Sequence, residues 1–457
     1  MRAKNEILRK KNDALTALAA QEEDQTKNLR RLLIIKPPTE DKEAIDTKIE
    51  EEPEPQHYNP VFKNLGAWIS ERMDLRYNEV RLMIEYRERG KANYSVFADR
   101  EKNSLLLELI ETNPFKFRKS DFDLYMCSGR VKSFDPYRAY FESLPPYSGD
   151  PIRELSAYIE VEETEGYRFA WQLKKWLVRV VKCALEEDYF NKQILVFVGE
   201  EQNSGKTSLC RWLCPPALEN YWSEEIPQGK DESIQLSSNF LILYDELAKL
   251  NKSSEAEVKT ILSKTKLKYR PPYDRAERVF ARRCSFLGNC NEMQFLTDPT
   301  GSVRYLAFLL KKINFDYRES CNIDEIYSQA YYLYKTGFEC DMTKKELDAQ
   351  AAYNRRFFST TTELDMIQFY LRPATQEDLD TYATEVYYWQ AGQILLFLQD
   401  CMPNLKFNQT TLGKALKFQG FERKAKKQGG LTRHVYPVVL NETGVYIREE
   451  LKRCRKR

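Results

Sequence analysis

The stretch that most constrains the fold is Ile194 to Leu213, which reads ILVFVGEEQNSGKTSLCRWL. Its opening apolar residues favour a buried strand, and SLCRWL at its end favours a helix. The tripeptide Gly205-Lys206-Thr207 lies in the loop between them. This order is typical of a phosphate-binding loop, in which backbone N–H groups and the positive end of the helix dipole face the phosphates. The stretch therefore predicts an α/β fold built around a nucleotide site.

The loop departs from the usual spacing at its opening glycine. The pattern G-x-x-x-x-G-K-S/T places a glycine at residue 200, but that residue is Glu200, and Gly199 lies one position earlier. A longer loop still encloses phosphate if a backbone turn takes up the extra residue. We therefore expect a working loop with Glu200 and Glu201 pointing to solvent, and with Lys206 neutralising the β- and γ-phosphates. The residues expected to bind the nucleotide are Gly199, Asn203, Ser204, Gly205, Lys206, Thr207 and Ser208.

Two later apolar stretches end in polar side chains suited to ATP hydrolysis. NFLILYDEL ends in Asp245 and Glu246, and CSFLGNCNEM contains Asn289 and Asn291. Because the carboxyl ends of parallel strands meet at one edge of a sheet, we expect these side chains to surround the phosphate loop. Thr207 and Asp245 would hold Mg²⁺, Glu246 would polarise the attacking water, and either asparagine could orient that water. Taken alone, the Asp-Glu pair is more often a helix N-cap followed by a first-turn acid.

Composition is typical of a globular protein in the cytoplasm. The chain has 457 residues, of which 42% are hydrophobic and 31% charged, with a net charge of +2. No apolar run approaches the roughly 18 residues of a membrane helix, and the N-terminus lacks the apolar core of a signal peptide. We therefore expect a cytoplasmic location and no membrane partner. Because the cysteines form no C-x-x-C pair and the only histidines are His57 and His434, a zinc site is not expected.

Changes along the chain predict four parts. Residues 1–57 combine a helical tail, either docked on a partner surface or solvated, with the acidic linker EDKEAIDTKIEEEPE. Residues 58–148 indicate a small α+β domain with a hairpin that turns near Gly90. Residues 149–356 indicate an α/β ATPase domain with a helical lead-in. Residues 357–457 indicate two helices and a basic hairpin, as in a winged helix.

The motifs from about residue 135 to 356 resemble the virulence-associated protein E family of P-loop ATPases from phages and genomic islands. The resemblance is carried by FDPYRAYFESLPPYSGDPI, GEEQNSGKTSL, FLILYDEL, YRPPYDR, GNCNE and TDPTGSVRY. Because that family is similar to superfamily 3 helicases of the AAA+ class, the resemblance implies an AAA+/superfamily 3-like P-loop core that uses ATP and Mg²⁺.

The family's functional residues match particular positions of this chain. Gly205, Lys206 and Thr207 match the phosphate loop, and Asp245 and Glu246 match the Walker B motif. Asn291 matches the asparagine that ends the family's G-T-T-N strand.

Arg304 matches the second arginine of the family's T-G-x-R-R-F/W stretch, whereas Val303 stands where the first arginine often lies. The match makes Arg304 a candidate finger that enters the ATP site of a neighbouring subunit. A salt bridge within its own subunit is the alternative.

Two basic segments point to DNA as a partner. Residues 264–283 carry eight Lys/Arg against two acids and can form two strands around DRAER; in superfamily 3 helicases, a hairpin at this place lines the central channel. Its candidate phosphate contacts are Lys266, Lys268, Arg270 and Arg275. The alternative is that these side chains pair with surface acids. In the C-terminal part, the candidate contacts to duplex phosphates are Lys414, Lys417, Lys424, Lys426, Lys427 and Arg433, and the alternative is a protein-docking module.

The function expected from these observations is an ATP-dependent DNA helicase or translocase that replicates a phage or mobile element. It would work as a ring of identical subunits, by resemblance a hexamer. Two alternatives stay open: a regulatory ATPase that recruits partners without unwinding, and a DNA-binding replication initiator that binds ATP without hydrolysing it. A primase or another replication protein is a candidate partner.

Overall fold

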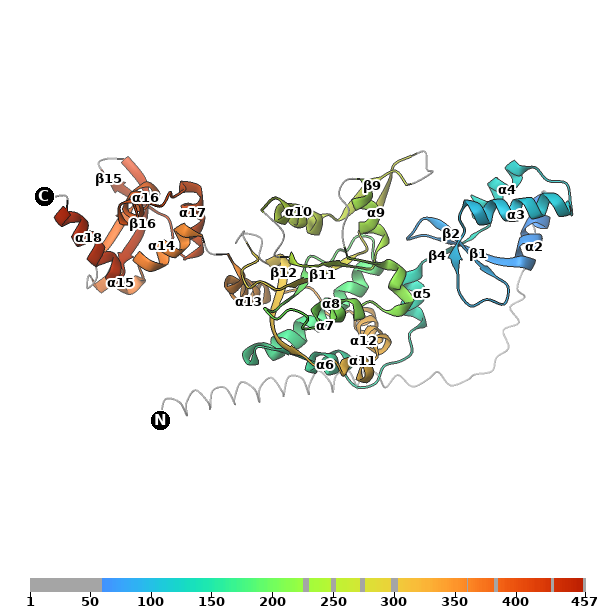
Figure 1. The fold of residues 1–457 in the computed structure, drawn as a ribbon, viewed down its shortest axis with the longest axis horizontal. Helices are drawn as coiled ribbons and strands as arrows, with labels where there is room; N and C mark the ends of the chain where they lie inside the picture. Colours follow the sequence, from blue (N-terminus) through green and yellow to red (C-terminus); the bar gives the residue numbers. More distant parts are fainter. Residues whose placement is uncertain are drawn as a thin grey trace, which may run out of the picture. The chain divides into compact units, whose positions relative to one another are not determined.

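A computed structural model describes residues 60–224, 230–247, 252–271, 276–296, 303–359, 361–381, 385–428 and 431–454. The tail and linker expected over residues 1–57 lie outside these ranges. The described part is a mixed α/β protein whose helices and strands are labelled in Figure 1. In the described ranges, no helix has both the length and the apolar character needed to cross a bilayer.

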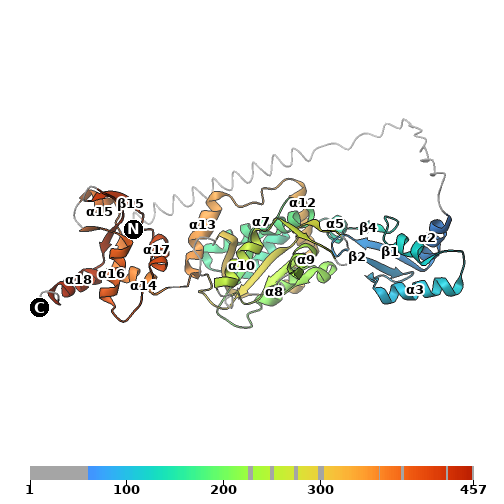
Figure 2. The same ribbon diagram turned by 90° about the horizontal axis from the view of Figure 1, so that it is seen from above.

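The first folded part is a four-stranded sheet with the order β3-β2-β1-β4. β1 and β2 pair antiparallel, and Gly90, with φ +85°, lies in the turn that follows β2 near the expected position. The helix α3 lies along this sheet (Figure 2) and shares a core with α2 and α4 that includes Leu65, Leu109 and Phe122. The elements are β1 (Met73–Asn78), β2 (Met83–Glu88), β3 (Ser95–Val96), β4 (Lys132–Phe134), α2 (Pro60–Arg72), α3 (Asp99–Thr112) and α4 (Lys119–Met126).

The central sheet has the strand order β5-β12-β6-β11-β8-β7. The strands from β12 to β7 are parallel, and β5 pairs antiparallel with β12. All residues of β6 and β11 are buried, which explains their unbroken apolar character in the sequence. The strands are β5 (Ile159–Val161), β6 (Ile194–Val198), β7 (Trp222–Ser223), β8 (Leu241–Tyr244), β11 (Ser285–Cys290) and β12 (Tyr305–Ile313).

Helices cover both faces of the central sheet. Leu195 and Phe197 of β6 share a core with α5, α6, α7 and α12, whereas Val196 and Val198 share another with α10 and α13. The domain boundary expected at residue 148 thus falls after α5, a helix that packs on the central sheet. The helices are α5 (Pro136–Ser143), α6 (Pro151–Ala157), α7 (Gly166–Leu185), α8 (Lys206–Trp212), α9 (Lys230–Ser238), α10 (Lys252–Ser263), α11 (Tyr317–Ser320), α12 (Ile323–Lys335) and α13 (Lys344–Asn354).

The C-terminal part is organised around the long strand β16, which pairs antiparallel with β13, β14 and β15. The expected helix, second helix and basic hairpin correspond to α16, α17 and β15–β16. Its core includes Ile367, Ile394, Leu412 and Val438. The elements are α14 (Thr362–Tyr370), β13 (Leu371–Pro373), α15 (Gln376–Thr381), β14 (Val386–Trp389), α16 (Ala391–Cys401), α17 (Gln409–Phe418), β15 (Lys424–Gln428), β16 (Leu431–Leu440) and α18 (Glu442–Cys454).

Candidate functional site

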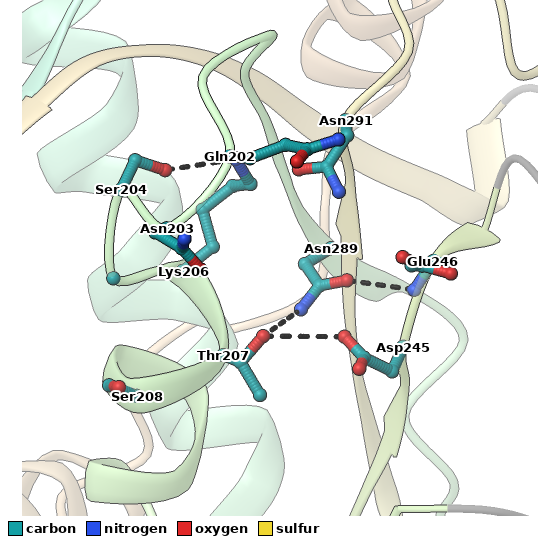
Figure 3. Close-up of a pocket in the computed structure, with 11 residues that line it drawn as sticks. Gln202, Asn203, Ser204, Lys206, Thr207, Ser208, Asp245, Glu246, Asn289 and Asn291 are labelled. Atoms are coloured by element: carbon teal, nitrogen blue, oxygen red, sulfur yellow. Dashed lines mark hydrogen bonds between the residues drawn. The ribbon is translucent and has the colours of Figure 1, made fainter.

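Polar residues from three segments line one cavity at the carboxyl edge of the central sheet (Figure 3). The segments follow or end β6, β8 and β11, which are adjacent and parallel, so that their carboxyl ends open at the same place. The cavity has a volume of about 370 Å³. Its lining residues are Gln202, Asn203, Ser204, Gly205, Lys206, Thr207, Ser208, Asp245, Glu246, Asn289 and Asn291.

The loop after β6 carries its extra residue in a tight backbone path. The Gly199 N–H donates to the Cys290 carbonyl at 3.0 Å, which fixes the start of the loop against β11. Asn203 and Gly205 both adopt left-handed backbone conformations, with φ +59° and +87°. Such φ values are tolerated best by glycine and asparagine, so the residue types suit the turn. Glu200 and Glu201 are exposed, as expected for acids next to an anion-binding loop.

Lys206 lies at the centre of this loop with its side chain only 6% exposed. Its ammonium donates to the Gly199 carbonyl at 2.8 Å, the Glu201 carbonyl at 2.8 Å and Ser204 Oγ at 2.9 Å. Burial lowers the pKa of Lys206, because desolvation disfavours the charged form. An anionic ligand in the cavity would counteract this effect and stabilise the charged form of the lysine.

Thr207 bonds directly to Asp245, and Asn289 joins Thr207 to Glu246 (Figure 3). The Thr207 hydroxyl donates to Asp245 Oδ1 at 3.3 Å and accepts a hydrogen bond from Asn289 Nδ2 at 2.7 Å. The other end of the same amide, Asn289 Oδ1, accepts from the Glu246 N–H at 2.8 Å. Hydroxyl and carboxylate oxygens are the ligands that Mg²⁺ prefers, so Thr207 and Asp245 form a suitable donor set.

Glu246 has a left-handed backbone, with φ +53°. For a residue with a side chain this conformation costs about 1–3 kcal/mol and persists where the surroundings enforce it. The bond from the Glu246 N–H to Asn289 is one such restraint. Asn289 is 3% exposed. Its two hydrogen bonds link Thr207 to the residue that follows Asp245 after β8.

The two candidate asparagines occupy different places in the cavity. Asn289 makes the bonds to Thr207 and Glu246, whereas Asn291 lies just past the end of the same strand, beside Gln202 (Figure 3). The sequence left both asparagines as candidates for orienting the water, and the resemblance to the virulence-associated protein E family favoured Asn291. One signal could have favoured Asn289 as the bridging residue: a buried polar side chain within an apolar strand needs hydrogen-bond partners. Sequence reasoning did not identify Gln202, because a glutamine in a loop carries no distinctive pattern.

Arg304 does not line this cavity. It lies just before β12 and is half-buried, and its Nη2 donates to Ser263 Oγ at the end of α10 at 3.3 Å. Its expected action on a neighbouring subunit stays a prediction.

The segment after α10 forms the expected hairpin. β9 (Lys266–Tyr269) pairs antiparallel with β10 (Arg278–Ala281). Lys266 and Lys268 are exposed, whereas Leu267 between them is buried. Lys266 pairs with Asp188 at 2.9 Å and Lys268 with Glu277 at 3.0 Å, the kind of pairing that the alternative anticipated. Arg270 is exposed, and Arg275 lies outside the described residues.

The lysines singled out in the C-terminal part lie on α17 and β15. Lys414 and Lys417 are exposed on α17. On β15, Lys424, Lys426 and Lys427 are exposed, and the Lys426 ammonium lies 3.2 Å from the centre of the Tyr388 ring. Arg433, opposite Lys426 in the hairpin, is also exposed.

The described part of the chain is a mixed α/β protein whose lysine-containing loop, threonine and acid lie at one edge of a sheet. Residues 151–361 match the model of the virulence-associated protein E-like domain. This part of the chain is therefore similar to the virulence-associated protein E-like domain, and the predicted resemblance is confirmed.

The chain also has similarity to solved structures. The ligand-free C-terminal region of NrS-1, residues 305–718, aligns with a TM-score of 0.45 and 14% identity, over 83% of this chain and 98% of that one. Its A form aligns with a TM-score of 0.45 and 12% identity over the same shares. No curated protein sequence matches the chain.

Proposed function

We propose that the chain is an ATP-dependent DNA helicase or translocase that acts in the replication of a phage or mobile element. The observation that carries the proposal is the convergence of Lys206, Thr207, Asp245 and Asn289 on one cavity. These residues come from three separate segments, namely the start of α8, the residue after β8 and the strand β11, and their chemistry suits a magnesium nucleotide. The virulence-associated protein E-like domain over residues 151–361 supports the same assignment.

In this proposal each side chain has a distinct task in ATP hydrolysis. Lys206 exchanges its bonds within the loop for bonds to the β- and γ-phosphate oxygens. Thr207 and Asp245 hold Mg²⁺, which neutralises charge on the phosphates when bound. Glu246 accepts a hydrogen bond from the water that attacks the γ-phosphorus, so that a bond to the water oxygen forms as the bond to the ADP oxygen breaks. Asn289 fixes the positions of Thr207 and Glu246 relative to one another through its two hydrogen bonds.

We further propose that Arg304 completes the ATP site of the next subunit in a ring. Its position outside its own subunit's cavity supports this role. Mixing Arg304→Ala with Lys206→Ala subunits tests it. Neither variant should hydrolyse ATP alone, but a mixture should regain activity, because a Lys206→Ala subunit still supplies Arg304 to an intact neighbouring site. A mixture as inactive as its components would contradict the trans role.

The hairpin β9–β10 is the proposed track for single-stranded DNA. Lys266 and Lys268 project from one strand and bind phosphates without reading sequence. Their acidic partners are themselves largely exposed, and exposed ion pairs contribute little to stability, so that DNA phosphates can replace these partners.

The decisive experiment measures ATP turnover with and without single-stranded DNA, together with strand displacement on a forked substrate. The proposal expects DNA to stimulate turnover and expects unwinding that Lys206→Ala abolishes. ATP turnover that DNA leaves unchanged, without strand displacement, would instead favour a regulatory ATPase. The ion pairs of Lys266 and Lys268 are the observation that favours this second candidate.

A further inference from the structure

An exposed aromatic side chain, Phe315, lies against the loop that carries Gly205. Phe315 is 46% exposed. A Cβ added at Gly205 would stand 2.5 Å from its ring, so the ring is in contact with the Gly205 backbone. Gly205 itself lines the cavity. Phe315 does not itself line the cavity, and its ring lies next to the cavity through its contact with Gly205.

The strand β12 brings Phe315 to this place. Leu309 of β12 pairs with Val198, the last residue of β6, and β12 continues to Ile313. At about 3.3 Å per residue, the strand extends roughly 13 Å beyond its neighbour. The edge strand β5 supports this extension, since Ile313 pairs with Ile159. The chain then turns back and places Phe315 over the loop.

The turn that holds Phe315 is well fixed. The Asn314 N–H donates to the Tyr158 carbonyl at 2.8 Å, and the Asp316 N–H donates to Asn314 Oδ1 at 3.0 Å. Two residues later, Tyr317 is fully buried and packs edge-to-face on Trp212 of α8 at 5.0 Å between ring centres. The fold thus buries one aromatic ring of this segment and leaves the other open to solvent beside the cavity.

We infer that Phe315 and Arg318 form the base subsite of the nucleotide site, where the Phe315 ring stacks on the purine base of ATP. This inference rests on the proposed ATPase function and specifies how the same site recognises its substrate. The exposed guanidinium of Arg318 lies 5.3 Å from the centre of the Phe315 ring, where it steadies the ring and adds a second planar surface. A purine offers more stacking area than a pyrimidine, so stacking favours ATP and GTP over CTP.

The test compares binding of ATP, CTP and inorganic tripolyphosphate to the full chain with Mg²⁺ present. Phe315→Ala should raise the Kd for ATP about 10-fold to 100-fold, the usual range for losing a base–aromatic stack, and leave the Kd for tripolyphosphate unchanged. Phe315→Trp should keep ATP affinity. Phe369→Ala, which removes another exposed phenylalanine (55%) far along the chain on α14, is the matched control and should change neither Kd.

Three outcomes would overturn the inference. If Phe315→Ala leaves the Kd for ATP unchanged, the base does not stack there. If Phe315→Ala raises the Kd for ATP and the Kd for tripolyphosphate equally, the ring only supports the loop. In both cases the wild type still binds ATP and the proposed function stands. If the wild type binds neither ATP nor tripolyphosphate, the nucleotide site itself is wrong and the proposed function falls with the inference.

Discussion

Asn289 offers the sharpest test of how the site is held together. Asn289→Ala removes two hydrogen bonds, one to the Thr207 hydroxyl and one from the Glu246 N–H, at 2.7 and 2.8 Å. Each bond contributes about 0.5–1.5 kcal/mol, so the free energy of unfolding should fall by about 1–3 kcal/mol. Both partners are partly accessible to water, which keeps the loss within this range.

The effect of the same substitution on catalysis should be larger than stability alone explains. Without Asn289, Thr207 loses a fixed hydroxyl orientation and Glu246 loses a restraint on its strained backbone. Because small displacements of reacting groups are costly, we expect kcat for ATP hydrolysis to fall about 10-fold to 100-fold. The Mg²⁺ concentration that gives half-maximal rate should rise.

The matched control is Asn239→Ala, which removes a buried asparagine that bonds to Gln235 before β8. Because it removes one such bond, it should lower the free energy of unfolding by about 0.5–1.5 kcal/mol without changing kcat. Steady-state kinetics and urea unfolding measure both quantities. An Asn289→Ala protein that folds and keeps the wild-type kcat and Mg²⁺ dependence would refute the assigned role.

Three further predictions concern other parts of the chain. Gly205→Ala should destabilise the protein by about 1–2 kcal/mol in thermal unfolding and weaken ATP binding, because its φ is +87°. Replacing Lys266 and Lys268 together by alanine should weaken single-stranded DNA binding and lower the magnitude of its log–log salt dependence by about 1.4, with basal ATP turnover unchanged. Burial alone would raise the pKa of Glu346, but hydrogen bonds from Lys175 and others outweigh it and lower that pKa from 4.5 to about 2. The stability from this carboxylate is therefore complete above pH 4.5 and lost as pH falls toward 2, and Glu346→Gln should flatten urea-derived stability over that window.

The parts of the central fold predictable from sequence were those with strong local signals. The apolar runs at β6, β8 and β11 predict buried strands because strands covered on both faces must be apolar throughout. Their polar ends predict a shared site, since parallel strands share a carboxyl edge. The long amphipathic helix α7 is equally predictable, because its apolar residues recur at helical spacing.

Other features depend on tertiary contacts that no local pattern encodes. The edge strands Ile159–Val161 and Trp222–Ser223 are too short to show any periodicity, and only the sheet defines them. The pairing of β16 with β13 and β14 joins residues far apart in the chain, whereas its hairpin with β15 is local. The position of Phe315 against Gly205 follows from the overhang of β12, which sequence spacing does not predict. The bridging role of Asn289 likewise depends on a tertiary feature, the position of β11 between β6 and β8 in the sheet.

The central claim is that Lys206, Thr207 and Asp245 form one site that hydrolyses magnesium ATP. Its most direct test is the rate of phosphate release from ATP in Mg²⁺ by the wild type and by Asp245→Asn, a substitution that keeps shape but removes the charge. We expect steady turnover by the wild type and a loss of at least about 100-fold in the variant, with both proteins equally folded. Equal rates for the two folded proteins would show that the acid at the end of β8 takes no part in hydrolysis, and the assignment of the site would be wrong.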